Sequence, residues 1–111
     1  MPDDFVPRPF RCDIAQRDGS TYLRPEGDLD MSTVDELGQL LDAARADGAR
    51  RIVVDLRGLS FMDSTGISLL TRYNNAASLD GFDLALVQGH KRIARLFSLT
   101  GLDEYFTFVT G

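Results

Sequence analysis

A stretch of fifteen residues, IVVDLRGLSFMDSTG at 52–66, constrains the fold of this chain more strongly than any other. It begins with an almost unbroken apolar run over 52–56, which is typical of a short strand buried on both faces. A short loop follows, and Asp63-Ser64-Thr65-Gly66 then precedes apolar residues at helical spacing. The stretch therefore predicts a central strand of an α/β sheet that leads into a helix with a small hydroxyl at its N-terminus, beside carboxylates.

The segments before this stretch predict a β-hairpin. Apolar and polar residues alternate over 10–14, which is the period of a half-buried strand. Asp18-Gly19 predicts a hairpin turn, and a second strand is expected over 21–26. Because Pro25 cannot donate a ladder hydrogen bond, it indicates an edge or the end of that strand, and residues 27–30 are expected to leave the sheet.

Helices and strands are expected to alternate along the rest of the chain. A capping box of Thr33 and Glu36, or a cap by Ser32, is expected to start a helix that ends near residues 47–48. A helix over 65–79 follows the strand at 51–56, and an apolar strand over 82–87 comes next. A third amphipathic helix is predicted over 90–99, and residues 105–109 are either a last strand or a docking segment.

This order, β-β-α-β-α-β-α with or without a last strand, predicts the fold class. We expect a single α/β domain over 10–111, in which a mixed, mainly parallel sheet opens with an antiparallel hairpin and helices pack against it. Functional groups in such sheets gather beyond the carboxyl ends of the strands. Asp28, Asp55 and Ser64 are all expected to lie there.

The composition limits the classes of partner. The 111 residues fit one domain, of which 43% are hydrophobic and 26% charged. The net charge of −5 argues against a nucleic-acid partner, which requires clustered Lys and Arg. Plain solubility and an acidic partner surface remain as equal explanations of that charge. Cys12 is the single cysteine, which excludes an internal disulfide. It falls at an apolar position of the strand pattern over 10–14, so we expect it to act as a small buried hydrophobic side chain.

Residues 1–9 carry three of the four prolines and are expected to form a flexible N-terminal arm. They have neither the basic nor the apolar region of a signal peptide. No apolar stretch in the sequence approaches the length that a membrane span requires. We therefore expect a cytoplasmic protein that does not associate with a membrane.

The role of Ser64 stays open at this point. Either Asp63 or Ser64 can cap the following helix by accepting a bond from a backbone N–H of its first turn. Alternatively, the Ser64 hydroxyl is exposed for phosphorylation, and the N–H groups and dipole of the helix N-terminus would receive a phosphate without refolding. Gly66 lacks a Cβ and would leave room for a partner to approach that backbone closely.

Catalysis by Ser64 is disfavoured because a nucleophilic serine needs an adjacent base. His90 is the only histidine, and it opens another predicted helix. The G-x-S-x-G elbow of serine hydrolases is also absent around Ser64. We expect no catalytic residue.

A receiver domain with Asp55 as its phosphoacceptor is a second class that the sequence disfavours. That class needs an acidic pair after its first strand, to hold Mg²⁺, and a lysine after its last. Asp13 stands alone inside a predicted strand, and Lys91 is the only lysine after the strand over 82–87. Asp28 and Asp30 are best explained as solvated charge, and no glycine-rich phosphate loop with a lysine occurs. We expect neither a metal nor a cofactor.

The motifs resemble those of a known family. Residues 52–56 followed by 61–66 resemble the signature of STAS domains of the anti-sigma factor antagonist type, and Gly-Asp-Leu-Asp at 27–30 resembles a second signature of that family. The element order and length agree from about residue 10 to the C-terminus. Asp-Ser-Thr-Gly is a weak motif alone, but it is specific when the preceding strand and the upstream motif accompany it.

The resemblance implies a role in bacterial partner switching. The unphosphorylated protein would bind an anti-sigma factor that is also a serine kinase of the GHKL type, which releases the sigma factor. The kinase would phosphorylate the serine aligned with Ser64 and so end the complex, and a PPM-type serine phosphatase would restore it. By the same match, Asp28 belongs to the kinase-facing surface. Asp63, Thr65 and Gly66 flank the acceptor, and Thr65 offers a second hydroxyl.

A phosphate at this position is expected to act by repulsion. Asp28, Asp55 and Asp63 would make this end of the sheet acidic. The arginines nearest in sequence are Arg57 and Arg24, and neither is obviously placed to bind a phosphate on Ser64. Alternative roles for the same fold are a scaffold in a stressosome-like assembly, a lipid-transport accessory protein and a sensor for a small ligand. A small enzyme is the least favoured class.

Overall fold

The computed structural model describes residues 10–111, which form a five-stranded mixed sheet with three helices. The strands are β1 (Arg11–Arg17), β2 (Ser20–Leu29), β3 (Arg51–Asp55), β4 (Leu59–Met62) and β5 (Asp83–Val87). The helices are α1 (Val34–Ala46), α2 (Ser64–Asp80) and α3 (Lys91–Leu99), with a 3₁₀ turn, η1, at Leu56–Gly58. This order confirms the predicted α/β class, with β4 as an additional strand. The predicted arm at 1–9 lies outside the described residues.

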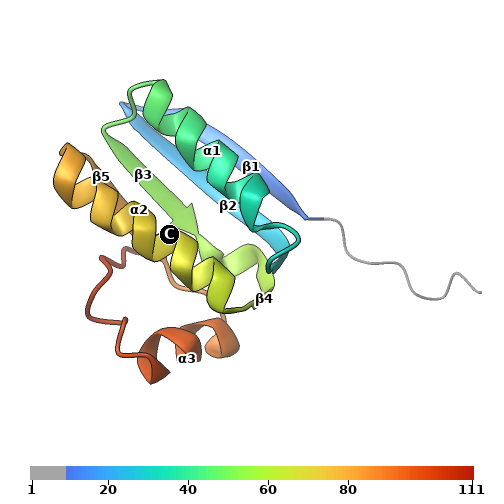
Figure 1. Cartoon of the computed structure of the whole chain (residues 1–111). Helices are drawn as coiled ribbons and strands as arrows, with labels where there is room; N and C mark the ends of the chain where they lie inside the picture. The colour runs from blue at the N-terminus through green and yellow to red at the C-terminus, as the bar shows by residue number, and fades with distance from the viewer. Residues whose placement is uncertain (1–9) are drawn as a thin grey trace, which may run out of the picture.

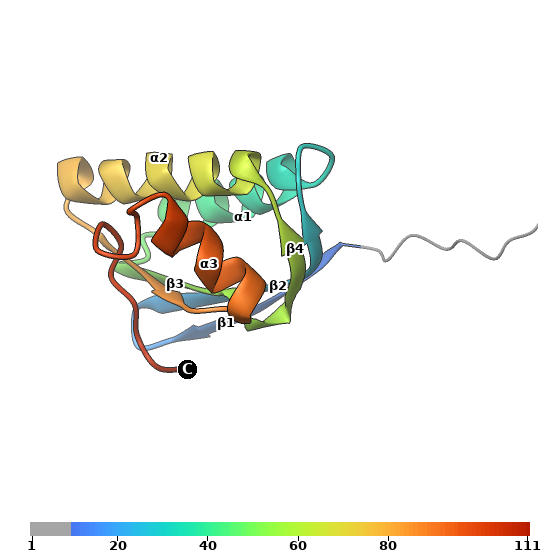
Figure 2. The same cartoon turned by 90° about the horizontal axis from the view of Figure 1, so that it is seen from below.

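The sheet has the order β1-β2-β3-β5, and β4 pairs with the far end of β2. The β1–β2 pair is antiparallel and the other pairs are parallel, as expected for a hairpin that opens a parallel sheet. Figure 2 shows α1 and α2 in one layer over one face of the sheet. Within residues 10–111 no helix covers the opposite face (Figures 1 and 2).

The hairpin turn forms where the sequence predicted it. Asp18 and Gly19 have φ angles of 55° and 82°, the pair of positive values that a tight hairpin turn requires. The prediction for the edge strand β1 was only partly right. Cys12 is half-buried against the core, but Ile14 remains 53% exposed, because the edge strand has a neighbour on one side only.

Strand β2 is longer than predicted. It pairs with β3 over residues 20–23 and with β4 over residues 27–29, so residues 27–29 stay in the sheet instead of leaving it. Pro25 is buried between these two pairings, where neither β3 nor β4 needs an N–H from it. The predicted end of the strand is wrong because residues 59–62, expected to be part of a loop, form the four-residue strand β4. Residues 27–29 pair with that strand and so remain in the sheet.

Helix α1 starts without the predicted capping box. Thr33 occupies the N-cap, but its side chain makes no cap bond. Its hydroxyl instead donates to the carbonyl of Asp28 (2.7 Å) and accepts from the N–H of Asp30 (3.0 Å). The backbone at the end of β2, three and five residues earlier, therefore takes the hydroxyl that the spacing assigned to the helix. The predicted apolar face is buried at Leu37, Leu41 and Ala44.

The core lies between the sheet and the helices. Helix α2 ends at Gly81 in the left-handed conformation (φ 78°) and buries Gly66, Leu69, Leu70 and Ala77. In the C-terminal segment, Phe108 makes only an isolated bridge to Leu86. Phe106 and Phe108 pack edge-on against Phe97 of α3, with ring centroids 5.4 Å away in both cases. Residues 105–109 therefore form a docking segment and not a last strand, which decides between the two predicted alternatives.

Candidate functional site

The N-terminus of α2 is attached directly to the end of the sheet. Leu29 of β2 pairs with Met62 of β4, and the N–H of Asp63 donates to the carbonyl of Leu29 (3.2 Å). Helix α2 starts at the next residue, Ser64. Figure 1 shows this end of α2 next to β4. The backbone of Ser64 is therefore held by two paired strands rather than by a free loop.

Asp63 is the residue that caps α2. Its carboxylate accepts from the N–H of Thr65 at 2.9 Å and from the Thr65 hydroxyl at 2.5 Å. The backbone of Asp63 is extended, with φ −109° and ψ −170°, which is the conformation expected of an N-cap residue. Of the two candidates for the cap, Asp63 takes the role, and the hydroxyl of Thr65 is engaged in the same interaction.

Ser64 is left without a capping role. Its side chain is exposed, and its hydroxyl makes no hydrogen bond to any other residue within 10–111. It is the first residue of a helix of 17 residues, and the N–H groups of the three residues that follow it all donate to Asp63, either to its carboxylate or to its carbonyl. The site thus holds an accessible hydroxyl at the positive end of a helix dipole.

Gly66 has a packing role in this structure. It is buried, and a Cβ at this position would lie 2.7 Å from Cγ of Met62 and 3.0 Å from Cδ2 of Leu29. The missing side chain therefore lets α2 approach β4 and the end of β2.

Asp28 lies in β2, one residue before the end of the strand, and is half-buried. Its Cα partner on β4 is Phe61. The following loop is ordered by Asp30, whose carboxylate accepts from the N–H (2.9 Å) and the hydroxyl (2.6 Å) of Ser32. These bonds hold the pKa of Asp30 below its ordinary value. Both residues therefore lie at the end of β2 that pairs with β4, and this part of the surface leads along the chain into the start of α2.

Asp55 does not belong to this surface, which corrects the expected cluster of Asp28, Asp55 and Ser64. Side chains alternate along a strand, and Val54 faces the core beneath the helices, so Asp55 points to the helix-free face. There Arg57 donates to it from Nε (3.0 Å) and Nη2 (2.8 Å). The Arg57 guanidinium holds the pKa of the Asp55 carboxyl below its ordinary value.

Two exposed apolar side chains near Asp28 were not identified as site residues from the sequence. Phe61 on β4 is 48% exposed, and Met31, in the loop after β2, is 77% exposed. Phe61 follows a predicted buried strand and belongs to the motif, so its position was a usable signal. Its exposure depends on the pairing of β4 with β2, which the sequence pattern did not predict.

Other kinds of site find little support in the described part of the chain. Among residues 10–111, no group of three or more His, Cys, Asp and Glu side chains is arranged to hold a metal ion. His90 is the N-cap of α3 and makes no side-chain cap bond. None of the helices described is both long and apolar enough to cross a membrane.

Comparison with known proteins agrees with this geometry. The family model of the STAS domain matches residues 11–110. This chain therefore belongs to the STAS domain family, a class defined by a mixed sheet with helices packed against it. Within that family its similarity is to the anti-sigma factor antagonists, which are regulatory proteins and not enzymes.

Three relatives illustrate the similarity. An anti-sigma-B factor antagonist of Staphylococcus aureus (strain NCTC 8325 / PS 47) is 41% identical over 78 residues, which is 70% of this chain and 72% of the relative. The crystal structure of an anti-sigma factor antagonist from Mycobacterium paratuberculosis superposes with a TM-score of 0.77 at 26% identity, covering 96% of this chain and 92% of the other. The Bacillus protein SpoIIAA in its phosphorylated form shares the fold, with a TM-score of 0.68, 23% identity and 92% of each chain covered.

Proposed function

We propose that this protein is an anti-sigma factor antagonist that is switched by phosphorylation of Ser64. The unphosphorylated form binds an anti-sigma factor that is also a GHKL-type serine kinase, and this binding releases the sigma factor. Phosphorylation of Ser64 ends the complex, and a PPM-type serine phosphatase restores the binding form. The function belongs in the cytoplasm of a bacterium, where sigma factors act.

The observation that carries this proposal is the exposed Ser64 hydroxyl, which has no hydrogen-bond partner within residues 10–111. Asp63 caps the helix, so modification of Ser64 breaks no structural bond. The positive end of the α2 dipole favours the negative charge that a phosphate adds at this position. Thr65 is the weaker acceptor, because its hydroxyl already donates to Asp63.

The surface around Ser64 is suited to bind a protein. Asp63 and Thr65 flank the acceptor, Asp28 lies on β2 where that strand pairs with β4, and Gly66 sets the distance between the helix and the strands. Met31 and Phe61 add exposed apolar area next to Asp28. Apolar anchors with polar neighbours are typical of protein–protein contacts. We assign this combined surface to the kinase.

Repulsion at the contact is the mechanism of the switch. A phosphate adds about −1.5 to −2 charges at neutral pH. Arg24 and Arg57 are not available to neutralise it, because both line a groove on the helix-free face of the sheet. Truncating or unpairing a charge in a contact costs about 2–5 kcal/mol, which corresponds to a loss of affinity of roughly 30-fold to several thousand-fold.

The test is phosphorylation by the cognate kinase with ATP, followed by intact mass measurement. We expect one added phosphate on the unmodified chain and on Thr65→Val, and none on Ser64→Ala. Ser64→Ala should still bind the kinase, whereas the phosphorylated form should bind at least about 30-fold more weakly. Equal binding of the two forms would contradict the switch, and labelling of Ser64→Ala would contradict the assignment of the acceptor.

A further inference from the structure

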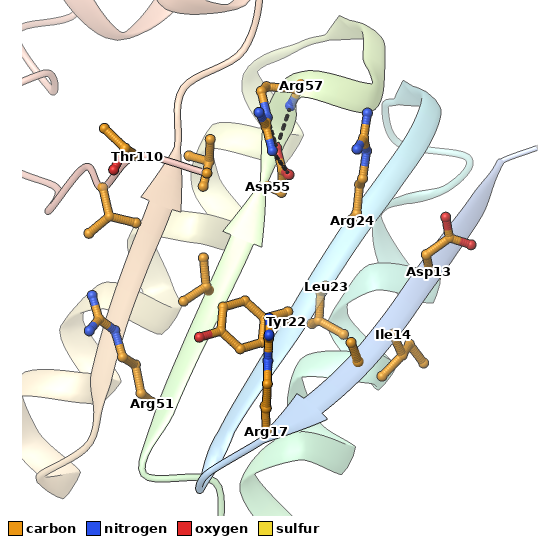
Figure 3. Close-up of a pocket in the computed structure, with 15 residues that line it drawn as sticks. Asp13, Ile14, Arg17, Tyr22, Leu23, Arg24, Arg51, Asp55, Arg57 and Thr110 are labelled. Atoms are coloured by element: carbon orange, nitrogen blue, oxygen red, sulfur yellow. Dashed lines mark hydrogen bonds and ion pairs between the residues drawn. The ribbon is translucent and has the colours of Figure 1, made fainter.

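The helix-free face of the sheet carries a groove of about 700 Å³. Figure 3 shows its arrangement: Arg24 and Arg57 lie at one end, Arg17 and Arg51 at the other, and Tyr22 between them. The volume lies within the range of roughly 300–1,000 Å³ that is usual for small-molecule sites. This groove is separate from the surface around Ser64, since neither Ser64 nor Asp28 lines it.

The middle of the groove is apolar. Tyr22 of β2 and Val53 of β3 are Cα partners in the parallel pair, so their side chains lie next to each other on this face. Val53 belongs to a small buried cluster with Val87, against which Val109 of the C-terminal segment packs. Tyr22 itself is one of the exposed large side chains of the protein. A flat apolar body can therefore lie on the ring of Tyr22 and the edge of this cluster.

The two ends of the groove are positively charged. Four arginine and two aspartate side chains line it, although the chain as a whole has a net charge of −5. Arg57 is paired with Asp55, and Arg17 lies over the Tyr22 ring at 5.4 Å from its centroid. Arg24 and Arg51 make no ion pair within residues 10–111. These two guanidinium groups remain available to an anion.

Arg51 supplies an independent indication of a ligand. Its Nε is buried and has no hydrogen-bond partner, the one such side-chain atom among the described residues. Buried donors nearly always have a hydrogen-bond partner in the protein, because burial removes their hydrogen bond to water and this loss destabilises the fold unless another acceptor replaces it. Because Arg51 lines the groove, a small rotation of its side chain would bring this N–H to an acceptor there, and a planar guanidinium is well suited to a carboxylate or phosphate.

We propose that the groove binds a small organic anion. A planar apolar body lies on Tyr22 and Val53, and a carboxylate, sulfonate or phosphate group accepts from Arg51, with Arg24 contributing positive charge at the far end. The local excess of arginine on an acidic protein selects for anions. The site is independent of Ser64 phosphorylation, so its failure would not affect the proposed switch.

The test is a titration of the full chain with 1-naphthoate, followed by amide chemical shifts. We expect saturable shifts at Tyr22, Arg51 and Val53. Arg51→Gln should bind 1-naphthoate at least 10-fold more weakly. Arg24→Gln should also bind it more weakly, and this second variant tests the proposal if the first one folds poorly. Arg92→Gln, on the exposed face of α3, is the matched control and should bind as the unmodified chain does.

Two reference compounds separate charge from shape. The neutral 1-naphthamide should bind at least 10-fold more weakly than 1-naphthoate, and inorganic phosphate should shift Arg51 without shifting Val53. The proposal is overturned if naphthamide binds as well as naphthoate, if Arg51→Gln binds as well as Arg92→Gln, or if no shift saturates. Shifts at these residues that depend on protein concentration would show that a second copy of the chain covers the face, which would also overturn it.

Discussion

At the scale of single residues, the structure separates roles that neighbouring residues share in the sequence. Asp63 and Thr65 form one capping interaction, and Ser64 between them takes no part in it. Gly66, one position further, is required by the packing of the helix on Leu29 and Met62. Within these four consecutive residues, two form the helix cap, one provides close packing, and Ser64 takes part in neither. The motif alone does not show which residue has which role.

Gly66→Ala should destabilise the fold. The new Cβ would overlap Met62 and Leu29, and overpacking of this kind costs about 1–3 kcal/mol, less about 1 kcal/mol gained from helix propensity. Gly38→Ala in α1 is the matched control, because its Cβ would meet only Leu69 at 3.5 Å, an ordinary contact. Urea unfolding should show a lower midpoint for Gly66→Ala and an equal or higher one for Gly38→Ala. The opposite order would contradict the packing role.

Cys12 should react slowly in the folded protein. Burial raises the pKa of its thiol from 9.0 to about 11, so at pH 8 the thiolate is about 100-fold rarer than in an unperturbed cysteine. Labelling by iodoacetamide, followed by intact mass, should therefore be at least about 100-fold slower in buffer than in 8 M urea. Equal rates in both solutions would show that β1 leaves the thiol open.

At the scale of secondary-structure elements, the start of α2 depends on one side chain. Asp63→Ala removes the acceptor for the Thr65 N–H, and loss of an N-cap costs about 0.5–2 kcal/mol. Asp63→Asn keeps an acceptor and should lose much less stability. Thermal unfolding measured by circular dichroism distinguishes the two. Equal losses in both variants would mean that charge near the helix dipole, rather than the hydrogen bond, is what Asp63 supplies.

The elements also show which signals in a sequence are local. The Asp18-Gly19 turn and the end of α1 near residues 47–48 were predicted, because each depends on residues within one or two turns. The capping box of α1 was not formed, since Thr33 bonds to Asp28 instead of to its own helix. A side chain with two nearby partners is assigned by the path that the backbone takes between strand and helix, which its spacing alone does not show.

At the scale of the whole molecule, the two faces of the sheet have separate chemistry. The face under α1 and α2 contains the main core, and Ser64 is exposed at the start of α2. The opposite face carries the arginine-lined groove (Figure 3). A protein partner and a small anion can therefore be bound at the same time without competing for residues.

Phe61→Ala should weaken binding of the kinase. An exposed aromatic side chain beside Asp28 has the character of a hot spot, whose truncation costs about 2 kcal/mol or more, or at least 30-fold in affinity. Leu79→Ala is the control, since Leu79 is 85% exposed but lies at the other end of α2. Calorimetric titration should show a loss for Phe61→Ala only. Equal affinities for both variants would place the contact elsewhere.

Acid should destabilise the protein through carboxylates that are more acidic when folded. The pKa of Asp55 is lowered chiefly by the hydrogen bonds from Arg57, and the pKa of Asp30 chiefly by those from Ser32. Their contribution is complete above the unfolded pKa of about 3.9 and is lost as the pH falls through the lower folded values. The melting temperature of Asp55→Asn should therefore depend less steeply on pH below about 4.

Asp103→Asn provides the control for this measurement, because Asp103 is exposed and its carboxylate accepts no hydrogen bond within residues 10–111. Its melting temperature should follow the same pH dependence as that of the unmodified chain. If the melting temperature of Asp55→Asn follows the same pH dependence as that of the unmodified chain, the ion pair of Asp55 with Arg57 does not contribute to the loss of stability in acid.

The sequence by itself determined the α/β class, the hairpin turn, the order of the helices and of the strands other than β4, and the family of the chain, because periodicity, turn conformation and the motif are properties of neighbouring residues. Only the tertiary structure decided that β4 extends the sheet along β2, that Asp55 faces away from Ser64, and that the opposite face forms an arginine-lined groove. Each of these depends on which distant strand lies alongside and on which face a side chain then points. That pairing is settled by packing of the whole chain.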